Sequence, residues 1–242
     1  MDDSSALSAP DGLPTVEHVA SMIDHSLLRP ELTTAEVVDG LGIARRCRTA
    51  SACVRPSDVA RAVDALAGSG VMVATVIGFP HGSTTTATKV AEVAEALSLG
   101  ADEFDMVLHI GALCGGEGDY VGRDIRAVVE AAEGRTVKVI LENAYLTLEE
   151  KILGCHLAEE AGAAFVKTST GYAPSGATLE DIILMRAAVS PHVGVKAAGG
   201  VRTLDALLAM EAAGATRFGA TATVAILDEL RLRRTTQAGP GR

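Results

Sequence analysis

Several features that mark other protein classes are missing from this sequence. The four cysteines, Cys47, Cys53, Cys114 and Cys155, are widely separated and form no C-x-x-C pair. This spacing indicates free thiols in a reducing cytoplasm and argues against a cysteine metal site. No apolar run reaches the roughly 18 residues that cross a membrane, and residues 1–14 are acidic, without a basic-then-apolar leader. We therefore expect a cytoplasmic protein without a membrane partner.

Basic clusters are equally scarce. The formal net charge is -10, and the only basic run, Arg231 to Arg234, closes a helical pattern. Because nucleic acids and anionic membranes are bound by clustered Lys and Arg, we expect neither as a partner. The run is typical of a solvated helix end, where cations interact favourably with the helix dipole.

The chain instead repeats a unit in which a short apolar strand precedes a helix. Its 242 residues and 48% hydrophobic content suit one α/β barrel as well as two small domains, so composition does not decide between them. The candidate strands are Met22–Asp24, Ala52–Val54, Val71–Ile77, Glu103–Leu108, Val137–Glu142, the run Ala163–Val166 leading into Lys167, Val193–Ala197 and Arg217–Gly219.

Helix signals lie between these strands. Capping-box spacing occurs at Thr33 and Glu36 and again at Thr147 and Glu150. Further helices are predicted from Pro56, from Thr178 and from Thr221 to about Leu230, and one more places Val90, Val93, Ala94 and Leu97 on a buried face. The absence of a long linker argues against two domains and favours a single closed TIM (β/α)8 barrel over an open sheet. We place this barrel at residues 15–232, with flexible tails at 1–14 and 233–242.

Alternation within two strands turns charged residues into the barrel. The apolar residues that alternate over Phe104–Leu108 are expected to face the helices, which turns Asp105 inward. The same alternation in the fifth strand turns Lys138 and Glu142 inward. These two residues either orient the catalytic groups or form a structural ion pair.

Lysine is rare in this chain, yet two of its five lysines, Lys167 and Lys196, end adjacent strands. Neighbouring parallel strands lie about 4.8 Å apart, so the two ammonium groups can repel, and one can relieve the repulsion by losing its proton. Lowering a lysine pKa from about 10.4 to about 7 requires roughly 4 to 5 kcal/mol, which burial and a neighbouring cation can supply. A structural ion pair is the alternative explanation for a buried lysine.

A neutral lysine amine attacks aldehydes and ketones to form a Schiff base. Lys167 is the better candidate because the hydroxyl residues Ser169 and Thr170 follow it. The accompanying proton transfers require a third group. Alternate strands of a barrel fill the same interior layer, which makes Asp105 the candidate for this role. Asp105 could instead serve only as an ion-pair partner.

Glycines end the last three strands, where barrels commonly hold phosphate. They are Gly171 with Gly176, the pair Gly199 and Gly200, and Gly219, followed by Thr221 at the start of the last helix. Glycines let backbone amides approach a ligand, and a helix N-terminus favours an anion, so we predict a phosphorylated substrate. His25, His81 and His109 lie near strand ends without metal-ligand spacing, so no metal is expected.

Taken together, these motifs resemble those of the deoxyribose-phosphate aldolase family of class I aldolases. The resemblance rests on Ile23–Leu28, Thr75–Pro80, Glu103–Val107, Phe165–Gly171, Gly194–Gly200 and Gly219–Thr221. It implies a TIM barrel that reversibly cleaves 2-deoxy-D-ribose 5-phosphate to acetaldehyde and D-glyceraldehyde 3-phosphate, without a metal or other cofactor.

The resemblance also implies individual roles. Lys167 would form the Schiff base, Lys196 would perturb its pKa and assist proton transfer, and Asp105 would shuttle protons. Phosphorylated sugar and aldehyde substrates would contact Ser26, Thr170, Gly171, Gly199, Gly200, Gly219 and Thr221. The sequence leaves the oligomeric state open, and a homo-oligomer is one possibility.

The chain departs from the family pattern in several places. Thr221 and Ala222 stand where two serines are frequent, Tyr172 where some members have lysine, and His109 where asparagine is usual. The last residues, 237–242, also lack a tyrosine that some members carry. These departures put phosphate affinity in doubt more than the catalytic step. Two alternatives are a phosphosugar isomerase or epimerase, which would need a carboxylate pair or a metal, and a barrel that binds a phosphate ligand without turnover.

Overall fold

A closed barrel of parallel strands forms the centre of the molecule. The computed structural model describes residues 12–237, and within this range eight strands pair in sequence order. The strands are β1 (Ile23–Leu27), β2 (Ser51–Val54), β3 (Met72–Ile77), β4 (Glu103–Val107), β5 (Thr136–Ile140), β6 (Phe165–Lys167), β7 (Gly194–Ala198) and β8 (Arg217–Ala220). The closure comes from β8, which pairs with β1 through Phe218 opposite Ile23. The prediction of a (β/α)8 barrel is therefore confirmed.

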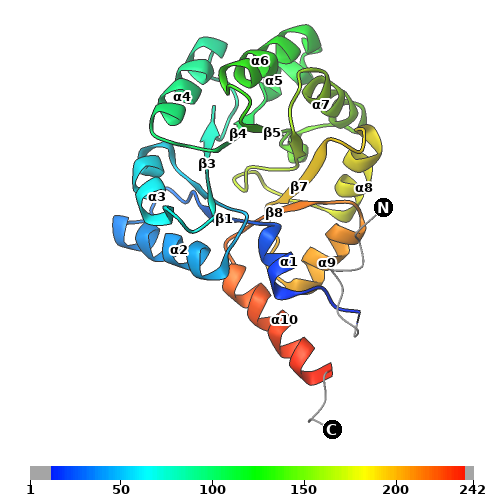
Figure 1. Cartoon of the computed structure of the whole chain (residues 1–242). Helices are drawn as coiled ribbons and strands as arrows, with labels where there is room; N and C mark the ends of the chain where they lie inside the picture. The colour runs from blue at the N-terminus through cyan, green and yellow to red at the C-terminus, as the bar shows by residue number, and fades with distance from the viewer. Residues whose placement is uncertain (1–11, 238–242) are drawn as a thin grey trace.

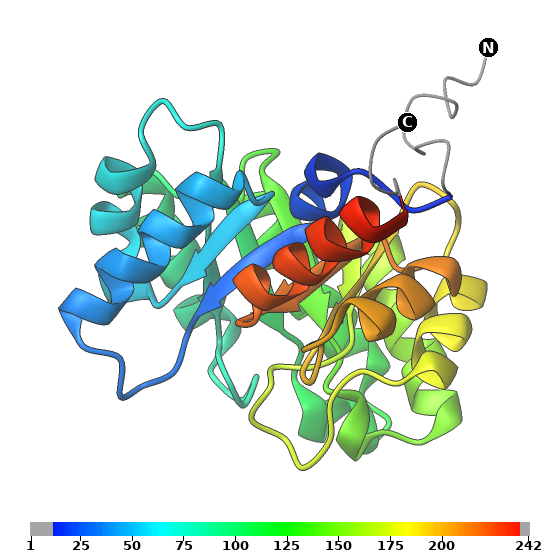
Figure 2. The same ribbon diagram turned by 90° about the horizontal axis from the view of Figure 1, so that it is seen from below.

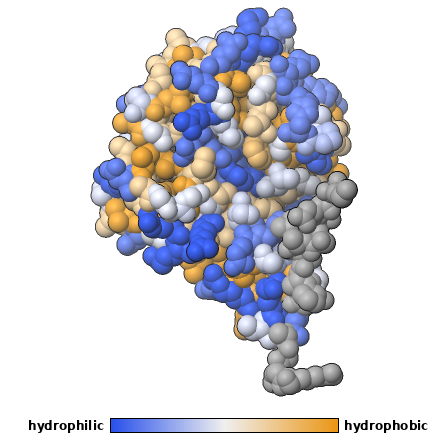
Figure 3. Space-filling view, viewed as in Figure 1, coloured by the Kyte–Doolittle hydropathy of each residue, from blue (hydrophilic) through white to orange (hydrophobic). Residues whose placement is uncertain are grey.

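Helices surround the strands on all sides (Figure 1). They are α1 (Val16–Ser21), α2 (Thr34–Cys47), α3 (Val59–Leu66), α4 (Thr86–Ser98), α5 (Ile110–Cys114), α6 (Gly118–Ala131), α7 (Leu148–Glu160), α8 (Leu179–Ala188), α9 (Leu204–Ala212) and α10 (Thr223–Gln237). The capping boxes predicted at Thr33 and Thr147 begin α2 and α7. Figure 3 shows hydrophilic residues gathered over α6 and α7. Among residues 12–237 no helix combines the length and apolar composition that a membrane span requires.

Two apolar clusters lie on opposite sides of the strands. The larger one packs between strands and helices and includes Phe104, Met106 and Leu108, which confirms the outward face predicted for β4. The smaller one lies inside the barrel and consists of Leu28, Cys53, Ala74 and Val76 with Phe79 packed against it. Apolar residues thus fill the interior beside β2 and β3, and the charged side chains lie elsewhere in the interior.

Two helix predictions need correction. Ala94 of α4 is exposed because the buried face of this helix is centred on Lys89 and Val93. Apolar periodicity cannot reveal a buried face that contains a lysine. The last helix, α10, begins at Thr223 rather than at Thr221.

The C-terminal helix extends beyond the predicted end of the barrel. It runs to Gln237 instead of stopping near Leu230. Its Arg234 donates hydrogen bonds to the backbone oxygens of Leu13 and Pro14 at 3.2 and 2.8 Å. Figure 2 shows this end of α10 beside the start of α1. Leu13, which we assigned to a tail, also packs against the apolar core, whereas residues 1–11 and 238–242 lie outside the described residues.

Candidate active site

Two lysines point into the barrel from neighbouring strands. Lys167 is the last residue of β6, and Lys196 lies opposite it on β7 as its register partner. Their side-chain nitrogens donate to the same oxygen, Oδ2 of Asp105, at 2.7 and 2.6 Å. The two amines therefore lie side by side. The structure thus brings together the three residues for which we predicted catalytic roles.

Asp105 is a fully buried carboxylate surrounded by three ammonium groups. Its second oxygen accepts a hydrogen bond from Lys138 at 2.8 Å. Burial alone would raise the pKa of Asp105, but Lys138, Lys167 and Lys196 together hold it well below its usual value. Asp105 is therefore ionised, and it can both pair with the lysines and accept a proton from a reacting group.

The two lysines differ in how many carboxylates they contact. Lys167 contacts Asp105 alone, whereas Lys196 contacts both Asp105 and Asp24. Burial and the repulsion from Lys196 lower the pKa of Lys167, despite the attraction of Asp105. Burial also acts to lower the pKa of Lys196, but Asp105 and Asp24 raise it above the ordinary lysine value. Lys167 is thus the amine that loses its proton first.

A second set of charges lies beneath the lysines, and two of its members, Asp24 and Arg217, were not identified from the sequence. Arg217 of β8 donates from Nε to Asp24 at 2.7 Å and from Nη2 to Glu103 at 2.6 Å. Glu103 in turn contacts the Lys138 nitrogen at 2.7 Å. In the sequence, the only sign of this set was that charged residues lie within strands. The pairing of Asp24 with Arg217 was not visible, because β1 and β8 meet only when the barrel closes.

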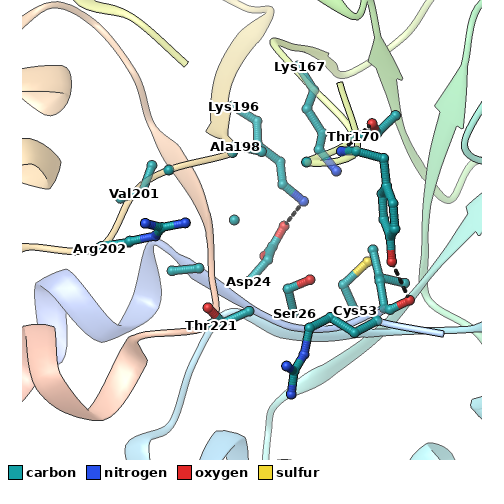
Figure 4. A pocket seen from close by; sticks show the side chains of 18 of the residues that line it. Asp24, Ser26, Cys53, Lys167, Thr170, Lys196, Ala198, Val201, Arg202 and Thr221 are labelled. Carbon is teal, nitrogen blue, oxygen red and sulfur yellow. Dashed lines mark hydrogen bonds and ion pairs between the residues drawn. The ribbon is translucent and has the colours of Figure 1, made fainter. Parts of the chain in front are cut away.

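A cavity of about 500 Å³ opens above this cluster. Lys167, Lys196 and Asp24 line it together with Ser26 and Cys53. In Figure 4 the two lysine side chains enter the cavity from one wall, while Ser26 and Cys53 lie across from them. Its volume is in the range of ligand pockets. The Lys167 amine is therefore buried but accessible to a small carbonyl compound.

The remaining predicted substrate-binding residues line the same cavity. They are Thr170, Gly171, Gly199, Gly200, Gly219 and Thr221. Gly199 has φ of +84°, and a Cβ there would lie 2.9 Å from the Cα of Gly176, so this turn requires glycine. Two arginines that we did not predict, Arg29 and Arg202, also line the cavity. Arg29 pairs with Glu31 at 3.2 Å, and Glu31 lines the cavity as well, so Arg202 is the arginine that adds positive charge to the cavity wall.

Thr170, a predicted substrate-binding residue, and Tyr172 and His109, which depart from the family pattern, each have hydrogen-bond partners within the protein. Thr170 donates its hydroxyl to Glu142, whose oxygens also accept from the Thr170 backbone. Tyr172 donates its hydroxyl to the Leu28 backbone oxygen at 2.8 Å. His109 caps α5 by accepting from the Ala112 nitrogen at 3.1 Å and is not among the cavity-lining residues.

The two interpretations of Lys138 and Glu142 are resolved by their contacts. Lys138 pairs with Asp105 and Glu103, so it both forms a structural ion pair and orients Asp105. Glu142 bonds to Thr170 instead of to Asp105 or Lys196. Among the described residues, no three His, Cys, Asp or Glu side chains are grouped as a metal site would require.

A barrel with a cavity-facing lysine, a second lysine and an ionised carboxylate defines an aldolase that works through a Schiff base. Comparison with known proteins narrows this class. A family model of DeoC/LacD family aldolases matches residues 15–228. The chain therefore belongs to the DeoC/LacD family of aldolases.

Individual relatives agree with this assignment. The deoxyribose-phosphate aldolase of Bacillus mycoides (strain KBAB4) is 50% identical over 211 residues, which cover 87% of this chain and 95% of the relative. That of Streptococcus gordonii is 51% identical over 205 residues, or 85% and 93% of the two chains. The solved deoxyribose phosphate aldolase of Aeropyrum pernix has a TM-score of 0.84 at 30% identity, with 90% and 92% coverage.

Proposed function

We propose that this protein catalyses the reversible cleavage of 2-deoxy-D-ribose 5-phosphate to acetaldehyde and D-glyceraldehyde 3-phosphate. The observation that carries the proposal is the Lys167 amine, which faces a cavity while sharing one carboxylate oxygen with Lys196. The relatives of about 50% identity are deoxyribose-phosphate aldolases and match the chain over most of its length.

Lys167 is assigned as the nucleophile. Its neutral amine adds to the C1 aldehyde of the open-chain sugar phosphate, and loss of water leaves a protonated Schiff base. The carbinolamine hydroxyl leaves as water after it receives a proton. Asp105, within hydrogen-bond distance of both lysines, relays protons to and from this centre, and Lys196 serves as the proton donor beside it.

Cleavage follows from the electron demand of the Schiff base. The C3 hydroxyl gives up its proton, the C2–C3 bond breaks, and its electron pair moves towards the iminium to form an enamine on Lys167. D-Glyceraldehyde 3-phosphate leaves at this stage. Protonation of the enamine at C2 and addition of water then release acetaldehyde and restore the free amine.

The phosphate is assigned to the end of the cavity where Gly171, Gly199 and Gly200 meet Thr221. Backbone amides in left-handed turns and the start of α10 favour an anion there. Arg202, in the loop after β7, adds positive charge at the same wall. This assignment predicts tighter binding of phosphorylated than of unphosphorylated sugars.

The geometry does not favour the two alternative functions. An isomerase or epimerase would work through a carboxylate pair or a metal, and it gives no reason for the two lysines, Lys167 and Lys196, that line the cavity. A barrel that only binds phosphate gives no reason for a lysine of lowered pKa beside the cavity.

The proposal is tested by covalent trapping. Borohydride added during incubation with deoxyribose 5-phosphate should leave a reduced adduct on Lys167, located by peptide mass spectrometry. Lys167→Ala should lose both the adduct and acetaldehyde release, and Lys151→Ala is the control that should keep both. An adduct that persists in Lys167→Ala, or a wild type that releases no acetaldehyde, contradicts the proposal.

We also propose an oligomeric state and a cellular location for this protein. The deoxyribose phosphate aldolase of Aeropyrum pernix is tetrameric, and we propose a homo-oligomer for this chain as well. Cys47, Cys53, Cys114 and Cys155 are free thiols, which supports a reducing cytoplasm as the location.

A further inference from the structure

Arg217 and Glu103 belong to the buried charge cluster although neither lines the cavity. Their side chains are 15% and 8% exposed and contact each other through the Arg217 Nη2 atom. Arg217 also contacts Asp24, and Glu103 contacts Lys138. Through these partners both residues are connected to Lys196 and to Asp105, and Asp105 contacts the Lys167 amine.

The cluster is electrically balanced only if one of its cations is neutral. Its carboxylates are Asp24, Glu103 and Asp105, and its cations are Lys138, Lys167, Lys196 and Arg217. Arginine keeps its proton in proteins. Four positive charges against three negative ones in a buried space favour the loss of one proton. Lys167 has the fewest carboxylate contacts, so it is the cation that becomes neutral.

Two other titratable groups face Lys167 without joining this network. Burial raises the pKa of the Cys53 thiol to about 11, so it is uncharged at neutral pH. Glu142 accepts a hydrogen bond from the Thr170 hydroxyl, and burial raises the pKa of Glu142. Neither Cys53 nor Glu142 contacts Arg217 or Glu103. The electrostatic effect of Cys53 and Glu142 on the Lys167 amine therefore stays constant when Arg217 or Glu103 is changed.

We propose that Arg217 is a positioning residue whose fixed positive charge, transmitted through Asp24 and Glu103, keeps the Lys167 amine unprotonated. Arg217 occupies two carboxylates that would otherwise be available to balance a charged Lys167. The proposal deepens the aldolase function proposed above and rests on it for the role of Lys167. The charge state of Lys167 can nevertheless be measured without turnover.

The chain offers a pair of substitutions with opposite expected signs. Arg217→Met removes a positive charge, so Lys167 should hold its proton more tightly and its titration should move to higher pH by about one unit. Glu103→Gln removes a negative charge at nearly constant volume, so the titration should move to lower pH. In the double variant the two charge changes cancel, so its Lys167 should titrate within a few tenths of a pH unit of the wild-type value.

Both single variants leave every remaining charge with a partner. Without Arg217, Asp24 still contacts Lys196, and Glu103 still contacts Lys138. Without the Glu103 charge, Arg217 keeps Asp24 and Lys138 keeps Asp105. If Arg217→Met nevertheless fails to fold, Glu103→Gln tests the proposal alone, because a purely structural role predicts no shift to lower pH.

The experiment is a titration of lysine side chains by NMR with ¹³C-labelled lysine, which gives one Cε signal for each of the five lysines. The Lys167 signal is assigned by its loss in Lys167→Met. Titration shifts of opposite sign in the two single variants, cancelled in the double variant, support the proposal. An unchanged Lys167 titration in Glu103→Gln, or shifts of the same sign in both variants, overturns it.

The same variants separate this inference from the proposed function. The pH profile of kcat/KM for acetaldehyde release should follow the NMR shifts, with its acidic limb moving in the same direction. If wild type releases no acetaldehyde, the proposed function fails while the titration still tests the role of Arg217. If wild type is active and the titration does not move, only the role of Arg217 fails.

Discussion

Lys89 and Lys167 are both buried lysines that contact a carboxylate, but their surroundings differ. Lys89, on α4, donates to Asp124 at 2.6 Å and to the Val107 backbone oxygen at 3.0 Å, and its side chain is 0% exposed. The other oxygen of Asp124 accepts from Thr86. This pair has one cation for one carboxylate and is sealed between helices and strands.

Lys167 instead shares its carboxylate with two further lysines and borders a cavity. A surplus of cations favours deprotonation, and the cavity gives the neutral amine a carbonyl to attack. Burial of a lysine is therefore not a sign of chemistry by itself. The ratio of cations to carboxylates and access to a ligand separate the reactive lysine from the structural one.

The largest expected effect comes from removing the reactive lysine. Lys167→Met should reduce turnover by at least about 10³-fold, because the covalent step is lost. Its stability should be maintained or increased, since a partly uncompensated amine is replaced by an apolar chain. The rate of acetaldehyde release and the urea unfolding midpoint measure the two effects. Turnover above a tenth of the wild-type value would contradict the proposal that Lys167 is the reactive lysine.

Removing the structural lysine should have the opposite pattern. Lys89→Met leaves the Asp124 carboxylate buried without its cation, which should cost about 3 to 5 kcal/mol of unfolding free energy. Turnover per folded molecule should stay close to wild type. Urea unfolding measures the loss, and the double variant Lys89→Met/Asp124→Leu should recover most of it. A loss below about 1 kcal/mol would show that Lys89 is not a structural ion pair.

His25 sharpens the comparison because it is a buried base without a carboxylate partner. Its Nδ1 lies 2.8 Å from the Thr223 hydroxyl. Burial lowers the pKa of His25 from 6.5 to about 4. Between pH 6.5 and pH 4 the unfolded chain takes up a proton on His25 that the folded protein does not. The contribution of His25 to the free energy of unfolding is therefore intact above pH 6.5 and is lost as the pH falls towards 4.

The loss should reach about 3 kcal/mol, at 1.36 kcal/mol for each pKa unit. Carboxylates titrate in the same range, so the quantity to measure is the difference in unfolding free energy between the wild type and His25→Gln at several pH values. The variant should lose less stability on acidification than the wild type. Parallel pH curves for both proteins would show that His25 accepts its proton as readily when folded.

The smallest effect concerns the packing around Lys89. Gly78 has φ of +61°, and a Cβ there would lie 2.7 Å from the Lys89 Cε atom. Gly78→Ala should therefore destabilise the protein by about 1 to 3 kcal/mol through strain and overpacking. A double-mutant cycle with Lys89→Ala should show part of this cost disappearing when the lysine is shortened. Strict additivity would mean that the backbone conformation alone carries the penalty.

The meeting of the three residues that we propose to be catalytic could be predicted because their signals are local. Lys167 and Asp105 each alternate with apolar neighbours in their own strands, and Lys196 follows the same pattern one strand further on. This was enough to predict that the three would meet. That Gly171, Gly199, Gly200 and Gly219 would line the same cavity could be anticipated for a similar reason, because they lie at or near the ends of neighbouring strands.

The residues that escaped prediction depend on contacts distant in sequence. Asp24 and Arg217 meet because β1 closes on β8, and no local pattern shows which interior charges face each other there. Lys89 escaped because it lies on the buried face of an amphipathic helix, where periodicity leads one to expect an apolar residue. Arg202 lies in a loop, where side-chain direction has no period.

The contacts of Asp24 also determine when the site can form during synthesis. Asp24 lies in the first strand, and its cations come from later ones: Lys138 from β5, at 3.6 Å, and Lys196 and Arg217 from the last two strands. A ribosome-bound chain that has not yet released the last two strands would have to bury Asp24 with only the more distant Lys138 as a counter-charge, which opposes compaction. We therefore expect the buried charge cluster to close only after nearly the whole chain has emerged from the ribosome.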